Sequence, residues 1–75
     1  MFDNSFDSVF AEFMARAIHG SLVVWFLDGH CLRTEASYLC EDDIRRDLRE
    51  WAAPHVGVAS ASFYSLALPV IRVRA

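Results

Sequence analysis

The sequence has little of what usually reveals a protein's class. It contains no lysine, two cysteines and three isolated glycines, and no apolar run reaches the roughly 18 residues of a membrane-spanning helix. Isolated glycines exclude a loop that cradles phosphate. The first residues lack the basic and apolar regions of a secretory signal, so we expect a cytoplasmic protein with reduced thiols and no membrane contact.

Length and composition predict one small domain over residues 1–75 with a thin core. A chain of 75 residues buries only about 60% of its unfolded surface. Because 55% of the residues are hydrophobic, some large side chains must lie on the surface or meet a partner, which favours partner binding or self-association. The net charge of −3 argues against direct binding of nucleic acid by the chain as a whole.

An amphipathic helix is predicted from Ser5 to His19. Its apolar residues recur at three- and four-residue spacing and form one stripe, which predicts that the helix packs on a core. Asn4 is a suitable N-cap, and Gly20 is suited to end the helix in the left-handed conformation. The stripe comprises Phe6, Val9, Phe10, Phe13, Met14, Ala17 and Ile18.

A β-hairpin is predicted over residues 22–35. Two runs rich in β-branched and aromatic residues flank Asp28 and Gly29, and this dipeptide favours a two-residue turn. The turn fixes the register and therefore the face on which each side chain lies. One face is predicted to carry the pairs Leu27–His30, Trp25–Leu32 and Val23–Thr34, and the other Phe26–Cys31, Val24–Arg33 and Leu22–Glu35.

The rest of the chain predicts a second helix and one or two strands. The helix runs from about Glu41 to Ala53, before Pro54, with a buried stripe of Ile44, Leu48, Trp51 and Ala52. Residues 58–75 are strand-like, and Pro69 marks an edge strand, a bulge or a break. The predicted fold is an α+β two-layer sandwich of α-β-β-α-β order, with or without a final strand, in which both helices cover one face of an antiparallel sheet.

Residues suited to catalysis or metal binding are few and poorly spaced. His30, Cys31, Cys40 and His55 lack the close pairing of a zinc site, and Cys31 is expected to be a small buried residue. No orienting third residue is evident for a nucleophile at Cys40. We therefore expect no enzyme activity, no metal and no cofactor, and we expect both cysteines to be free thiols.

A non-enzymatic protein-binding module is the function that the sequence favours. A small phage-type inhibitor of a host protein or nucleoprotein complex, by analogy with anti-CRISPR proteins, is one form of it. Its expected partner surface is basic, because acidic residues cluster at the start of the second helix. The predicted partner-binding residues are Glu41, Asp42, Asp43, Asp47 and Asp28 at the hairpin tip.

Two further hypotheses concern the sheet. A homodimer is predicted to form through Leu22, Val24 and Phe26, because a two-layer fold leaves one apolar face uncovered. As an alternative function, the chain is a nucleic-acid-associated regulator that uses Arg72 and Arg74 on the last strand, with Arg33 nearby. Such charges on an edge strand also serve to prevent aggregation.

Overall fold

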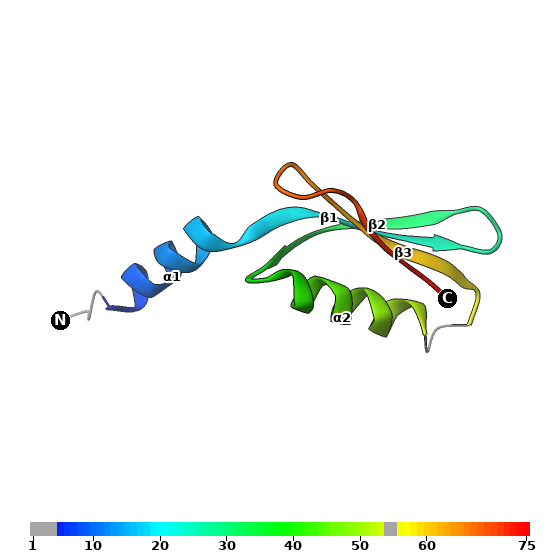
Figure 1. Ribbon diagram of the computed structural model, residues 1–75, viewed down its shortest axis with the longest axis horizontal. Coiled ribbons are helices and arrows are strands. Elements are labelled where there is room, and N and C mark those ends of the chain that lie inside the picture. The colour runs from blue at the N-terminus through cyan, green and yellow to red at the C-terminus, as the bar shows by residue number, and fades with distance from the viewer. Residues whose placement is uncertain (1–4, 54–55) are drawn as a thin grey trace.

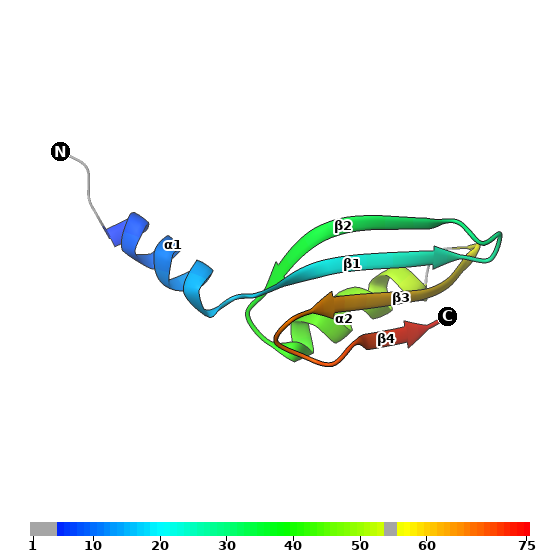
Figure 2. The same ribbon diagram turned by 90° about the horizontal axis from the view of Figure 1, so that it is seen from above.

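The computed structural model describes residues 5–53 and 56–75, which form a four-stranded antiparallel sheet and two helices (Figures 1 and 2). The strand order is β2-β1-β3-β4, and this arrangement confirms the predicted α+β fold. The elements are α1 (Ser5–Arg16), β1 (Ile18–Phe26), β2 (Cys31–Tyr38), α2 (Glu41–Ala52), β3 (Val58–Ser65) and β4 (Ile71–Arg74).

The hydrophobic core lies between α2 and one face of the sheet. Ile44 and Leu48 recur at four-residue spacing on α2 and have no exposed surface. Alternate residues of the two central strands meet them, because successive side chains of a strand point to opposite faces. The buried strand residues on this side are Leu22, Val24, Val58, Ala61 and Phe63.

Helix α1 ends earlier than the periodicity predicted. The helix stops at Arg16, and Ile18, His19 and Gly20 belong to β1. Gly20 is therefore not a helix terminator. It lies against β3, where an added Cβ atom would come within 2.2 Å of the Tyr64 carbonyl oxygen and 2.6 Å of the Phe63 ring. The glycine is needed for a close approach between strands.

Of the two helices in residues 5–53 and 56–75, α2 alone covers the sheet, whereas the prediction placed both helices on one face. In both views α1 projects away from the start of β1, while α2 lies along the sheet (Figures 1 and 2). The molecule is consequently elongated, with extents of 53 × 25 × 19 Å. Helix α2 closes the core over the central strands.

The β1–β2 turn has three residues rather than the predicted two. The Phe26 amide donates to the His30 carbonyl over 2.9 Å, and the Gly29 amide donates to the Phe26 carbonyl over 3.0 Å. Gly29 has a φ of 97°, which suits the residue that follows a turn in a three-residue hairpin loop. The extra residue shifts the register by one, so that Trp25 pairs with Cys31 and Val23 with Arg33.

The last segment forms two strands. Pro69 lies between β3 and β4, and β4 is an edge strand paired with β3 alone. Of the alternatives that the proline left open, the structure therefore shows a break, because Pro69 lies in the connection between Ser65 and Ile71 and in neither strand. Neither helix within residues 5–53 and 56–75 has the length and hydrophobicity required to cross a membrane.

Candidate binding surfaces

The face predicted to form a homodimer is buried inside the protein. Leu22 is 3% exposed and Val24 has no exposed surface, because both lie beneath α2. Phe26 is half-buried and packs against the same core. The assignment of these three residues to an interface was therefore wrong. Their face is the one that α2 covers.

The charged residues of α2 separate into two flanks. Glu41, Arg45 and Arg49 recur every four residues and face β4. The opposite flank faces the end of β2 and is predominantly acidic. It carries Asp43, Arg46, Asp47 and Glu50, and we call it the acidic flank. The predicted cluster is thus divided, since Glu41 lies on the other side and pairs with Arg45 at 3.6 Å.

Asp28 lies far from the other predicted partner-binding residues. The β1–β2 turn, which contains it, is at the opposite end of the sheet from the start of α2 (Figures 1 and 2). Its Oδ1 accepts a hydrogen bond from the His30 amide at 3.1 Å. That hydrogen bond is the main reason why the pKa of Asp28 lies below its usual value. Asp28 organises the turn and does not extend the acidic flank.

A surface hollow of about 360 Å³ lies between α1, the end of β2 and the acidic flank. Phe13 of α1 and Leu39 contribute its apolar walls, and they are 36% and 56% exposed. Tyr38 also lines it and donates a hydrogen bond from its hydroxyl to Asp47 Oδ2. Burial, followed by this hydrogen bond, raises the pKa of Tyr38 above its ordinary value. Asp47 therefore lines the hollow and also accepts the hydrogen bond of the partly buried Tyr38 hydroxyl.

The second face of the sheet, which α2 does not cover, is polar and aromatic. We call it the open face. The observed register places Arg33, Val23, Ser62 and Arg72 in one row across the four strands. The adjacent row contains Cys31, Trp25, Ser60 and Arg74, and the next contains Glu35, Ser21 and Tyr64.

Arg72 is held in place on the open face. Its Nε donates to Ser62 Oγ over 2.9 Å, and its Nη2 donates to the Tyr64 hydroxyl over 3.2 Å. Ser62 has no exposed surface, although neither of the two described helices covers the open face (Figure 1). The guanidinium is thus fixed by two neighbours on β3, and a fixed guanidinium loses less entropy when it binds an anion.

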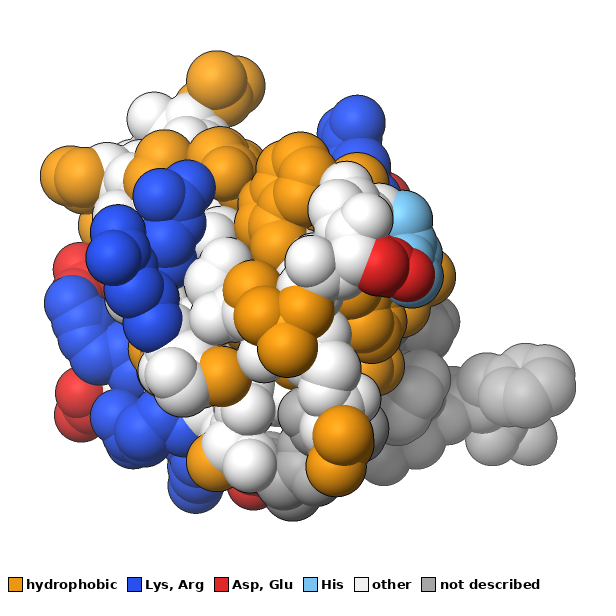
Figure 3. Space-filling model, turned by 90° about the vertical axis from the view of Figure 1, so that its right-hand side faces the viewer, with side chains coloured by type: hydrophobic (Ala, Val, Ile, Leu, Met, Phe, Trp, Pro, Cys, Tyr) orange, Lys and Arg blue, Asp and Glu red, His pale blue; other side chains and the backbone are white. Residues whose placement is uncertain are grey.

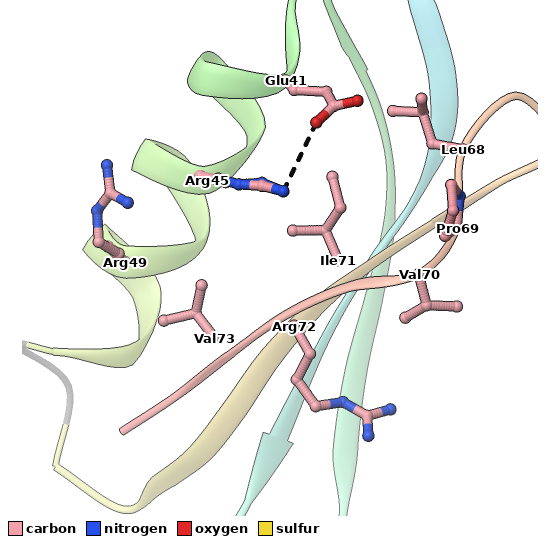
Figure 4. Close-up of a pocket in the computed structure, with 9 residues that line it drawn as sticks. All are labelled: Glu41, Arg45, Arg49, Leu68, Pro69, Val70, Ile71, Arg72 and Val73. Carbon is pink, nitrogen blue, oxygen red and sulfur yellow. Dashed lines mark ion pairs between the residues drawn. The ribbon is translucent and has the colours of Figure 1, made fainter.

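A groove of about 420 Å³ separates α2 from the edge strand β4 (Figure 4). Ile71 and Val73 point toward α2, while Arg72 points to the other side of the strand. In the end-on view, arginine side chains gather along the side of the molecule formed by β4 and α2 (Figure 3). The basic residues around this edge are Arg45, Arg49, Arg72 and Arg74.

The candidate metal ligands are scattered. Cys31 is exposed on the open face and Cys40 is exposed before α2, so the prediction of a buried Cys31 was wrong. His30 stacks on Phe26 with ring centroids 4.5 Å apart. His55 lies outside the described residues. Among the residues that are described, no three potential ligands gather into a group suited to a metal.

Comparison with known proteins identifies no relative. No family model matches the chain, and neither a curated protein nor a solved structure is significantly similar to it. Function must therefore be inferred from the surfaces themselves. The sequence-based prediction of site residues missed three aromatic side chains, Phe13, Trp25 and Tyr64. The alternation of serine along β3 and of arginine along β4 is visible in the sequence and is the one signal of the open face that it offers.

Proposed function

We propose that this protein is a non-enzymatic protein-binding module that docks through α1 and the hollow beside it. The observation that carries the proposal is the position of α1, which projects from the sheet instead of packing on it (Figures 1 and 2). The sequence nevertheless gives this helix an apolar stripe. A stripe of this kind needs a cover, and a groove on a partner protein is a common one.

The chemistry of the hollow indicates the character of the partner. Phe13 and Leu39 offer apolar contact next to the acidic flank, on which Glu50 has no ion pair with any described residue. A complementary partner has an apolar groove with a basic rim. Charges of opposite sign steer such an encounter and increase its rate. Nucleic-acid-binding proteins present basic surfaces of this kind, so we propose inhibition of such a protein as the biological role.

The docking helix is tested by capture of partners with wild-type and variant proteins. Phe13→Asp places a charge in the apolar stripe, whereas Ala15→Asp adds the same charge to the same helix on its other side. A partner that binds wild type and Ala15→Asp, and binds Phe13→Asp at least tenfold more weakly, supports the proposal. Equal binding by all three proteins contradicts it.

The acidic flank is tested by association kinetics with the captured partner. Glu50→Gln and Asp28→Asn each remove one negative charge, but only Glu50 lies beside the hollow. Glu50→Gln is expected to slow association and weaken its salt dependence, while Asp28→Asn leaves both unchanged. Identical effects of the two variants mean that the flank has no specific role.

A further inference from the structure

The open face has the opposite charge to the chain as a whole. Three arginines, Arg33, Arg72 and Arg74, lie on it with one acidic residue, Glu35, although the full chain carries a net charge of −3. The remaining described acidic residues lie on the helices or in the β1–β2 turn. Basic and acidic residues are mixed along the sequence, but in the structure the open face carries mainly basic residues.

Two aromatic rings lie within this basic surface. Trp25 on the central strand β1 is 39% exposed, and Tyr64 on β3 is half-buried. Between them the sheet carries the small side chains Ser60 and Ser62. A large indole that stays exposed beside small polar residues leaves a ring face accessible to a planar ligand.

Arginines lie on the two outer strands, on either side of the central strands that carry these rings. Arg33 on β2 and Arg72 on β4 lie in one row on the two outer strands, about 14 Å apart if neighbouring strands are spaced by about 4.8 Å. Arg74 lies on β4 in the row of Trp25 and has no ion pair with any residue in the described part of the chain. It is therefore available to an anionic ligand.

The basic surface continues around the edge of the sheet. Arg45 and Arg49 on α2 line the groove beside β4 together with one acidic residue, Glu41, which pairs with Arg45 (Figures 3 and 4). With Arg72, the lining of the groove still carries more positive than negative charge. One terminal nitrogen of Arg45, Nη1, is buried without a hydrogen-bond partner among the described residues. The other terminal nitrogen, Nη2, pairs with Glu41 at 3.6 Å, so Nη1 is the part of this guanidinium that can still donate to a second acceptor.

We propose that the open face binds single-stranded nucleic acid. Phosphate groups pair with Arg33, Arg72 and Arg74, and an unpaired base stacks on Trp25. Exposed aromatic rings on a sheet, combined with fixed guanidinium groups, are the chemistry by which proteins bind single strands. A duplex keeps its bases stacked inside and does not offer a base to Trp25. This surface is separate from α1 and the hollow, so the inference does not depend on the proposed function.

The test is fluorescence anisotropy with a labelled oligothymidine of about 15 nucleotides, which is near the upper site size of small single-strand-binding folds. Three phosphate contacts predict that the logarithm of the affinity falls with the logarithm of salt concentration with a slope of about −2. Arg74→Gln is expected to weaken binding and to reduce that slope by about 0.7. Arg16→Gln, which removes the same charge from α1, serves as the matched control and is expected to leave both unchanged.

Stacking of a base on Trp25 is tested by substitutions that keep a large apolar side chain at this position. Trp25→Leu keeps apolar volume but has no aromatic face, and it is expected to weaken binding fivefold or more. Trp25→Phe retains a ring and is expected to restore most of the affinity. Circular dichroism establishes that each variant is folded.

Three results would overturn the inference. The first is the absence of binding at low ionic strength. The second is an equal loss of affinity in Arg74→Gln and Arg16→Gln, which would reduce the effect to net charge. The third is equal binding of a duplex of the same length or of poly-glutamate, because neither of these polyanions offers an unpaired base.

Discussion

The side chain of Arg72 covers the hydroxyl of Ser62. The two residues are opposite each other on β4 and β3, and Arg72 Nε donates to Ser62 Oγ over 2.9 Å. Because Ser62 has no exposed surface, its hydroxyl depends on this donor in place of water. The pair joins the edge strand to the rest of the sheet, so Arg72 has a structural role beside its charge.

Replacing Arg72 by leucine is expected to lower the free energy of unfolding by about 1–3 kcal/mol, because a buried hydroxyl is left without its partner. Replacing both residues, in Arg72→Leu with Ser62→Ala, is expected to be less destabilising than Arg72→Leu alone. Urea unfolding of the four proteins of this double-mutant cycle measures the difference. Purely additive effects would mean that the hydrogen bond contributes nothing.

The register of the hairpin is tested by disulfide formation. With Cys40 replaced by serine, Trp25→Cys places a thiol opposite Cys31, at the separation of roughly 4.4–6.8 Å that a disulfide requires. Phe26→Cys places the thiol on the other face, one residue away. Mass spectrometry after mild oxidation is expected to show an intramolecular disulfide in the first variant only. A disulfide in Phe26→Cys would support a two-residue turn instead.

Sequence patterns predicted the elements of this fold better than their arrangement. Strand propensity and the Asp28-Gly29 dipeptide located the hairpin correctly, but that dipeptide suits both a two-residue turn and a three-residue loop. A shift of one residue moves every side chain of β2 to the other face. For this reason Arg33 was predicted to lie beside Val24, whereas it lies on the open face with Arg72.

The periodicity of apolar residues could not predict where α1 lies. A stripe of apolar residues indicates that one side of a helix will be covered, but it does not identify the cover. The sequence similarly grouped the acidic residues of α2 as one cluster. Only the rotation of the helix against the sheet separates Glu41 from Asp43 and Asp47, because residues on opposite flanks alternate along the chain.

The close approach at Gly20 predicts a strong effect of a small substitution. Gly20→Ala introduces a methyl group that would lie within 2.2 Å of a backbone oxygen of Tyr64, so strands β1 and β3 must separate. We expect a loss of about 2–3 kcal/mol in the free energy of unfolding. In Gly29→Asn the new side chain has open space around it and asparagine tolerates a positive φ, so a loss below about 1 kcal/mol is expected. Similar losses in both variants would contradict the packing at Gly20.

The hydrogen bond between Tyr38 and Asp47 predicts a dependence of stability on alkaline pH. Because the pKa of Tyr38 is raised on folding, the folded protein holds this proton more tightly than the unfolded chain does. The resulting stability is complete below about pH 10, the ordinary pKa of tyrosine, and decreases as the pH rises above it. At neutral pH the free energy of unfolding of wild type is expected to be about 1 kcal/mol higher than that of Tyr38→Phe.

That difference is expected to shrink above pH 10, as measured by urea unfolding of both proteins across the alkaline range. The ring of Tyr38 also meets the Phe63 ring edge-on at 5.3 Å, and phenylalanine preserves this contact. A difference that stays constant with pH would show that the ionisation of Tyr38 is not linked to folding.

We propose that α1 is a docking element outside the protein's own core. Amide hydrogen exchange, followed by mass spectrometry on the isolated protein at low concentration, tests it most directly. Amides of Ser5–Arg16 are expected to exchange much faster than those of Glu41–Ala52, because only α2 is packed on the sheet. Protection of α1 equal to that of α2, and independent of protein concentration, would contradict the claim by showing that α1 belongs to the core.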